Sequence, residues 1–153
     1  MLAGLTGTSE LEWAVSPPRD GRPFIIRHPA EVQAPFVSLS HDGNTAACSA
    51  SWAGPVGVDV QRDRPADRLR AIASFLGWPA YLVESNNAQL LTRAWATWEA
   101  CSKASGCSVL GPVPGFLSAM ESLAGRPSST RCIAKRLVDG WLVAIIIPPS
   151  PGD

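Results

Sequence analysis

The spacing of apolar and polar residues predicts both strands and helices along this chain. Short segments rich in β-branched or aromatic residues are bounded by Gly, Pro, Asp or Asn, which is typical of strands between turns. We expect such strands at 11–15, 24–26, 36–40, 46–52 and 56–61. Asp42-Gly43-Asn44 favours a hairpin between the third and fourth, and Asp139-Gly140 favours another between strands at 131–138 and 141–147.

A period of 3.6 residues predicts helices between these strands. The longest is expected from Ala88 to about Ser105, with Asn86 or Asn87 as its N-cap. Further helices are expected at 66–76 and 116–123. Together the elements predict a single α+β domain over 1–153, in which a mainly antiparallel sheet packs against the long helix. We expect 1–10 and 148–153 to be flexible.

Composition narrows the classes of partner. In 153 residues, 13 Lys and Arg balance 13 Asp and Glu, so the chain has no net positive charge that would attract nucleic acid or an anionic membrane. The longest apolar run, 141–147, is far shorter than the roughly 18 residues that span a bilayer, and we expect a soluble, cytoplasmic protein. The four cysteines lack the spacing of a zinc site and are interpreted as reduced thiols.

Four charged or polar residues are candidates for chemistry. Glu99 and Lys103 lie one turn apart beside the apolar arc of the long helix, a pattern that is most often a solvated ion pair. Asp59 and Gln61 point from strand 56–61 to the face opposite its valines and therefore leave the core face. An acid at a strand end usually faces water or caps the next turn, so spacing alone leaves a structural role open.

Four motifs nevertheless occur in the order known from one enzyme family. They are Gly21-Arg22-Pro23, Phe36-Val37-Ser38-Leu39-Ser40-His41-Asp42-Gly43, Pro55-Val56-Gly57-Val58-Asp59-Val60, and the helix from Trp95 through Glu99-Ala100 and Lys103 to Gly106. Over about residues 11–111 the chain thus resembles the phosphopantetheinyl transferases, whose fold we expect it to share. They move the phosphopantetheine arm from coenzyme A to a serine of an acyl or peptidyl carrier protein in polyketide or nonribosomal peptide biosynthesis.

The resemblance implies a magnesium site in which coenzyme A is the co-substrate. Asp59 would ligate Mg²⁺, and Glu99 would ligate it too or accept the serine proton. Gln61 stands where many relatives have another acid, and its carbonyl oxygen would supply a ligand without charge. Lys103 would neutralise phosphate oxygens.

Three further residues receive roles from the same resemblance. Ser40 and His41 would hold the phosphates of the coenzyme, and Arg22 would lie near its nucleotide. The alternatives are that His41 is a structural residue of a turn and that Arg22 is simply solvated.

The chain also departs from the family pattern. Trp98 replaces the usual Lys before the signature Glu, and indole offers only one N–H donor where a phosphate contact is expected. Compared with the two-halved surfactin-type enzymes, the resemblance begins late in the first half; the smaller holo-acyl-carrier-protein synthases form the site between subunits of a trimer, and a homo-oligomer of this chain could complete the cleft in the same way. The alternative function is therefore a divergent relative without transfer activity, acting as a carrier-protein-binding module or as a biosynthetic enzyme on a more apolar substrate.

Overall fold

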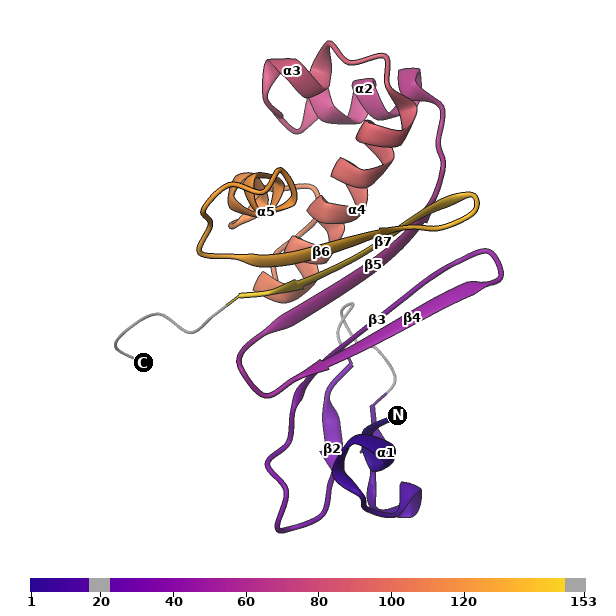
Figure 1. Cartoon of the computed structure of the whole chain (residues 1–153), viewed down its shortest axis with the longest axis vertical. Coiled ribbons are helices and arrows are strands. Elements are labelled where there is room, and N and C mark those ends of the chain that lie inside the picture. The colour runs from indigo at the N-terminus through magenta and orange to yellow at the C-terminus, as the bar shows by residue number, and fades with distance from the viewer. Residues whose placement is uncertain (17–22, 148–153) are drawn as a thin grey trace.

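A computed structural model describes residues 1–16 and 23–147 of the chain, and the fold contains both helices and antiparallel strands (Figure 1). The helices are α1 (Leu2–Thr6), α2 (Ala66–Phe75), α3 (Ala80–Val83), α4 (Ala88–Ser105) and α5 (Phe116–Leu123), with a 3₁₀ turn at Glu10–Glu12. The strands are β1 (Ala14–Val15), β2 (Ile25–Arg27), β3 (Phe36–Asp42), β4 (Thr45–Ser51), β5 (Val56–Arg62), β6 (Arg131–Arg136) and β7 (Gly140–Ile146). The α+β prediction is confirmed at this level.

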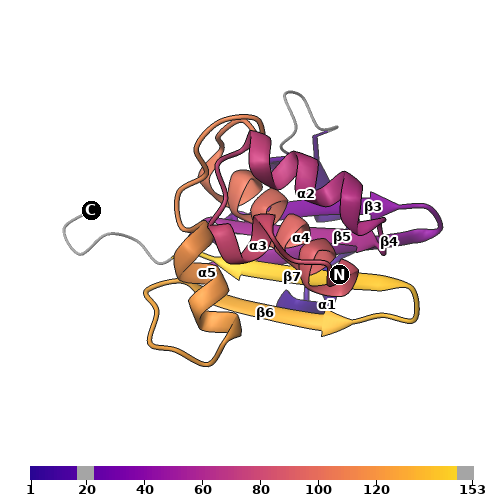
Figure 2. The same ribbon diagram turned by 90° about the horizontal axis from the view of Figure 1, so that it is seen from above.

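The main sheet has three antiparallel strands in the order β5-β7-β6. Asp59 lies opposite Val143 and Gly57 lies opposite Ile145, so these four residues share one face. That face packs against α4, which crosses over the sheet (Figure 2). Gly57 sets the distance, because a Cβ on it would lie 1.9 Å from the Ala100 carbonyl oxygen of the helix.

The long helix begins and ends where its sequence predicts. The Asn87 side chain accepts a hydrogen bond from the Leu90 N–H (3.0 Å) and thereby caps the first turn. At the other end Gly106 adopts a left-handed conformation with φ 68°, which favours glycine because it has no Cβ. The predicted span from Ala88 to Ser105 is confirmed.

One side of α4 is covered by a cluster of aromatic rings. Trp78 lies 5.5 Å from Trp98 and 5.0 Å from Phe116, measured between ring centroids. These rings are buried together with Leu69 and Leu82, which come from α2 and α3. The helices predicted at 66–76 and 116–123 are confirmed, and α3 is an additional short helix before α4.

A second sheet is the hairpin of β3 and β4, in which Leu39 lies opposite Cys48. The hairpin contacts the outer edge of β5 through side chains rather than a backbone ladder. The Val58 N–H donates to Ser38 Oγ (3.0 Å), and the Val60 N–H donates to Ser40 Oγ (3.2 Å). Two hydroxyl groups thus satisfy edge amides that would otherwise need a partner strand or water.

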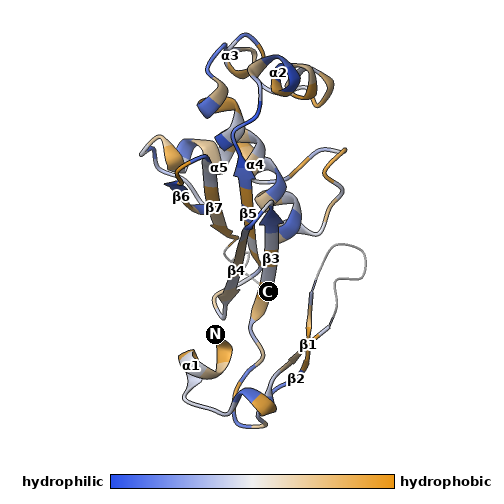
Figure 3. Ribbon diagram, turned by 90° about the vertical axis from the view of Figure 1, so that its right-hand side faces the viewer, coloured by the Kyte–Doolittle hydropathy of each residue, from blue (hydrophilic) through white to orange (hydrophobic). Residues whose placement is uncertain are grey.

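The N-terminal elements lie beside the hairpin, at the opposite end of the molecule from α2 and α3 (Figure 3). The expected strand at 11–15 is wrong in its first part. Ser9 and Glu12 form a capping box in which the Ser9 N–H donates to the Glu12 carboxylate (2.7 Å), so a 3₁₀ turn forms there instead. Strand structure is limited to Ala14–Val15, paired with β2.

The segment 1–10 contains a short helix in which Leu2 and Ala3 are buried. The prediction for 148–153 lies outside the described residues. No helix in the described part of the chain combines the length and apolar character needed to cross a membrane.

Candidate active site

A cavity of about 660 Å³ brings together six of the seven residues selected from the sequence. They come from three elements, namely Ser40 and His41 from β3, Asp59 and Gln61 from β5, and Glu99 and Lys103 from α4. The remaining wall contains Pro23, Leu39, Ala46, Ala47 and Cys48. The cavity therefore lies where the hairpin, the main sheet and the long helix meet.

Asp59 lies at the base of this cavity and is almost fully buried, with 1% of its surface exposed. The prediction that it leaves the core face with Gln61 is wrong, because α4 packs against that face, and β5 is buried on both faces from Val56 to Gln61. A solvated acid or a simple turn cap is thereby excluded for Asp59. A buried carboxylate needs partners, and the surrounding residues provide several.

Gln61 connects the two acids of the site. Its Nε2 donates to Asp59 Oδ2 (3.0 Å) and to Glu99 Oε2 (2.8 Å). The side-chain amide therefore uses both N–H groups between carboxylates from different elements. The two acids of the family pattern converge on one small space.

Glu99 is strongly affected by this environment. The pKa of the Glu99 carboxyl is raised to about 8, and burial is the largest cause. The charge and hydrogen bonding of Asp59 also raise this pKa, whereas Lys103 and Gln61 lower it. At neutral pH the Glu99 carboxyl thus retains its proton for most of the time. A nearby cation would favour the ionised form.

Lys103 provides the opposite charge. Its Nζ lies 2.6 Å from Asp59 Oδ1 and also donates to the Val58 carbonyl oxygen (3.1 Å). The interpretation of Lys103 and Glu99 as an isolated surface pair is therefore wrong, since Lys103 reaches across to the strand. One ammonium and two carboxyl groups share the base of the cavity.

Ser40 holds Asp59 in place from the hairpin. Its hydroxyl donates to Asp59 Oδ1 (2.7 Å) while it accepts from the Val60 N–H. His41 follows on the same strand and is exposed, so the prediction that it lies in a turn is wrong. Its side chain lines the cavity without a hydrogen bond to any described residue, whereas Arg22 lies outside the described residues.

Trp98 does not reach this cavity. Its ring packs edge-on against Phe116 at 4.9 Å, and its Nε1–H donates to the Val109 carbonyl oxygen (2.8 Å). The residue that departs most from the family pattern thus lies in the aromatic cluster on the other side of α4. It does not block the space between Asp59 and Glu99.

Sequence reasoning missed the apolar part of the wall. Leu39, Cys48 and Ala46 are presented by the hairpin, and only the cross-strand register brings them beside the acids. The alternation of Leu39 and His41 along β3 was the available signal, because both point to the same face of the strand.

Asp59 and Glu99 are oxygen donors of the kind that Mg²⁺ takes. Mg²⁺ commonly binds one or two carboxylates together with waters and substrate phosphates, and Asp59 and Glu99 supply such a pair. No group of three or more His, Cys, Asp or Glu side chains is arranged for a metal within residues 1–16 and 23–147. The repulsion that contributes to the raised pKa of Glu99 is the feature that a cation would relieve.

No protein-family model matches this chain. Comparison with curated proteins gives no match either.

Proposed function

We propose that this protein is a magnesium-dependent phosphopantetheinyl transferase, which moves the phosphopantetheine arm of coenzyme A to a serine hydroxyl of an acyl or peptidyl carrier protein. The observation that supports the proposal most is the convergence of Asp59, Glu99 and Lys103 in one cavity, beside the Ser40-His41 motif. These segments are distant in the sequence, and the family pattern requires that they meet.

The reaction exchanges one phosphorus–oxygen bond for another. The carrier serine oxygen bonds to the phosphorus that bears pantetheine, and the bond from that phosphorus to the bridging pyrophosphate oxygen breaks. Adenosine 3′,5′-bisphosphate leaves, and the serine proton passes to a base. Negative charge accumulates on the phosphate oxygens during this exchange, so nearby cations stabilise the transition state.

Each described residue has a role that follows from its contacts. Glu99 either ligates the Mg²⁺ ion beside Asp59 or accepts the serine proton, and its pKa of about 8 in the ion-free site suits the second role near neutral pH. Lys103 neutralises phosphate oxygens while it remains next to Asp59. Ser40 positions Asp59, since both hydrogen bonds of its hydroxyl are made inside the protein, and His41 faces the entering phosphates.

Asp59 would hold the Mg²⁺ ion, together with Glu99 where that residue is not the base, and Gln61 would offer its carbonyl oxygen after rotation of the amide. The ion would supply positive charge to the pyrophosphate oxygens. Polyketide or nonribosomal peptide carriers are the proposed acceptors.

The direct test is the mass of an apo carrier protein incubated with the chain, coenzyme A and Mg²⁺. We expect an increase equal to one phosphopantetheine arm. Glu99→Gln should reduce the rate by about 10²-fold or more, which is the range for loss of a general base. Glu121→Gln, an exposed acid on α5, is the matched control and should retain the wild-type rate. An unchanged mass with several carriers contradicts the proposal.

A second function is favoured by the apolar wall of the cavity. Lys103 and His41 are the basic residues among its described lining, whereas Leu39, Ala46, Ala47 and Cys48 offer no charge to a polyanion. A divergent relative that binds a carrier protein, or converts a more apolar substrate, would have this composition. Calorimetry separates the two functions, because the transferase requires coenzyme A binding that strengthens with Mg²⁺.

A further inference from the structure

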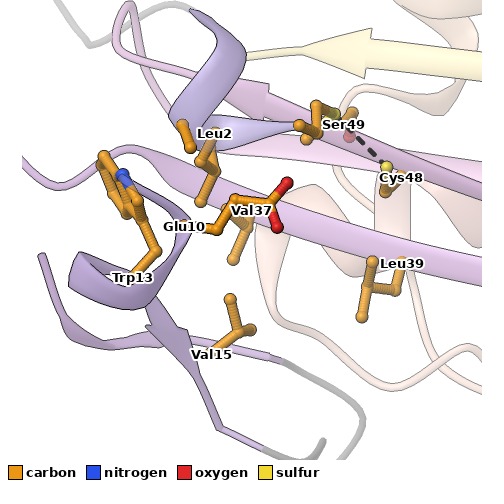
Figure 4. Close-up of a pocket in the computed structure, with 10 residues that line it drawn as sticks. Leu2, Glu10, Trp13, Val15, Val37, Leu39, Cys48 and Ser49 are labelled. Atoms are coloured by element: carbon orange, nitrogen blue, oxygen red, sulfur yellow. Dashed lines mark hydrogen bonds between the residues drawn. The ribbon is translucent and has the colours of Figure 1, made fainter. Parts of the chain in front are cut away.

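Besides the candidate active site, the structure contains cavities that are lined mainly by apolar side chains. One of them lies between the N-terminal elements and the hairpin, where Figure 4 shows Trp13 on one side and Leu39 on the other. It shares Leu39 and Cys48 with the candidate active site and therefore adjoins that site. Another, of about 520 Å³, shares no lining residue with the candidate active site and contacts Trp98 of α4. We call it the aromatic cavity.

The end of α2 forms one wall of the aromatic cavity. After this helix Gly77 adopts φ 66°, and the Trp78 N–H donates back to the Ala73 carbonyl oxygen (2.9 Å). This is a Schellman ending, which turns the chain so that the residue after the glycine packs against the helix. The Trp78 side chain is consequently buried, whereas Phe75 in the last turn of α2 lines the cavity and is 76% exposed.

The segment that follows α4 forms the opposite wall. The Trp98 Nε1–H donates to the Val109 carbonyl oxygen (2.8 Å), which holds this segment beside the helix. Phe116 is buried in the wall, while Leu110 and Leu117 line the cavity and are 70% and 57% exposed. The aromatic cavity therefore combines buried rings with a rim of large apolar side chains that contact water.

The lining of the aromatic cavity restricts what it can bind. No charged side chain occurs among its lining residues in the described part of the chain, so a charged ligand would lose its hydration without gaining a partner. The rings of Trp78, Trp98 and Phe116 offer faces and edges to an aromatic ligand. Its volume lies within the roughly 300–1,000 Å³ found for small-molecule sites and suits a molecule of two fused rings.

The Trp78 side chain adds a polar requirement. The indole N–H of Trp98 is paired with a carbonyl oxygen, but the buried Nε1–H of Trp78 has no hydrogen-bond partner within residues 1–16 and 23–147. Buried donors without a partner are rare in folded proteins, because they lower stability. An acceptor oxygen on a bound molecule would satisfy this donor. A fitting ligand thus combines aromatic surface with a neutral acceptor such as a ketone.

We propose that the aromatic cavity is a binding site for an uncharged aromatic molecule that carries a hydrogen-bond acceptor. This site is separate from the candidate active site, since Trp98 lines one and the neighbouring Glu99 lines the other. Occupation of the aromatic cavity therefore leaves the candidate active site open. The inference goes beyond the proposed function and does not depend on it.

Equilibrium dialysis of the full chain against 2-acetylnaphthalene tests this inference. We expect one molecule per chain, with a dissociation constant of about 100 µM or below for an uncharged ligand of this size. Leu110→Glu places a charge at the rim and should weaken binding about tenfold or more. Ile133→Glu is the matched control, because Ile133 is 73% exposed on β6 and does not line the cavity, and it should retain the wild-type affinity.

A second comparison tests the unpaired indole N–H. The probe 2-ethylnaphthalene has the same ring system without the ketone, so the ratio of the two affinities reports the hydrogen bond to the oxygen. We expect the preference for 2-acetylnaphthalene to fall about fivefold in Trp78→Phe, which keeps a ring and removes the donor. The ratio is the quantity to compare, because the smaller ring weakens the binding of both probes.

Absence of saturable binding up to about 1 mM of the probe overturns the inference. Unchanged binding in a folded Leu110→Glu variant, or displacement by coenzyme A, also overturns it, because the probe then lies elsewhere. A wild-type dimer that dissociates in Leu110→Glu, measured by light scattering, would show that a second copy of the chain covers the rim instead. An unchanged affinity ratio in Trp78→Phe contradicts the acceptor. If one variant fails to fold, the other still decides.

Discussion

Gln61 is the single residue that most affects the state of the candidate site. Its amide nitrogen donates to Asp59 and Glu99 at once and so supplies part of the attraction that a cation would supply. A neutral amide cannot add charge to a metal site, however. The hydrogen bonds of Gln61 stabilise the ion-free form of the site and therefore lower the affinity of Asp59 and Glu99 for Mg²⁺.

Replacement of Gln61 by Glu should therefore strengthen magnesium binding. The substitution adds a third carboxylate to the site and removes the amide that bridges Asp59 and Glu99. Because the charge of the ligands tunes the affinity of such sites, we expect the Mg²⁺ affinity to rise about tenfold. Calorimetric titration with MgCl₂ measures the change. Gln33→Glu, at an exposed position, is the control and should leave the affinity as it was. An equal or weaker affinity in Gln61→Glu would contradict the bridging role.

At the scale of single residues, the sequence identified which residues belong to the site but not their contacts. Asp59, Glu99 and Lys103 could be selected because their motifs resemble a known pattern. That Lys103 pairs with Asp59 could not be read from spacing, since the two lie on different elements. The same limit applies to Gln61, whose two partners are brought to it only by the packing of α4 on β5.

At the scale of elements, the close packing of α4 on β5 determines the site. Gly57 allows the approach, and Trp98 anchors the helix from its other side. The helix itself could be predicted because its N-cap, its period and its final glycine agree. The sequence could not predict which residues of α4 face the cavity. Trp98 turns away from it because its ring packs with Trp78 and Phe116, and this cluster forms only in the folded chain. The error at 11–15 arose because the local capping box outweighs a short strand pattern.

Gly57→Ala tests the helix–sheet distance. The new Cβ would meet the Ala100 carbonyl at 1.9 Å, so the helix must shift, and we expect a loss of about 2–4 kcal/mol in the free energy of unfolding. Denaturant titration measures this loss. Gly4→Ala introduces a Cβ with no atom within 4 Å into α1 and should leave the free energy of unfolding unchanged or raise it by up to about 1 kcal/mol.

Trp98→Lys tests the location of the departure from the family pattern. Restoring the family lysine would place an ammonium among buried rings, and we expect a destabilisation of about 3 kcal/mol or more without faster carrier loading. Trp98→Phe is the control, because it keeps an aromatic ring and adds no charge, although it loses part of the buried indole and the hydrogen bond to the Val109 carbonyl. A stable Lys variant with increased transfer would show that position 98 serves the phosphates.

At the scale of the whole molecule, the site makes stability depend on pH. The pKa of Glu99 is raised from 4.5 to about 8 in the folded chain. Between these values the folded state binds more protons than the unfolded state, so the free energy of unfolding decreases as pH rises. A site prepared for a cation thus lowers the stability of the ion-free protein at neutral and alkaline pH.

Thermal unfolding of wild type and Glu99→Gln from pH 5 to pH 8 measures this contribution. We expect the melting temperature of the wild type to fall over this range and that of Glu99→Gln to fall less, because the variant has no carboxyl group to ionise there. Glu121→Gln should keep the wild-type slope. Equal slopes in wild type and Glu99→Gln would show that burial of Glu99 has no such effect on folding.

The attachment of the hairpin through Ser38 and Ser40 has a consequence for association between molecules. Amide groups on an open sheet edge are a template for strands of other chains, and two hydroxyl groups occupy them here. Each such bond contributes only about 1 kcal/mol net, far less than a continuous ladder. The two serines thereby block the addition of a strand from another molecule at β5. The β3–β4 hairpin, which carries His41, remains a separate two-stranded sheet and is not a fourth strand of the main sheet.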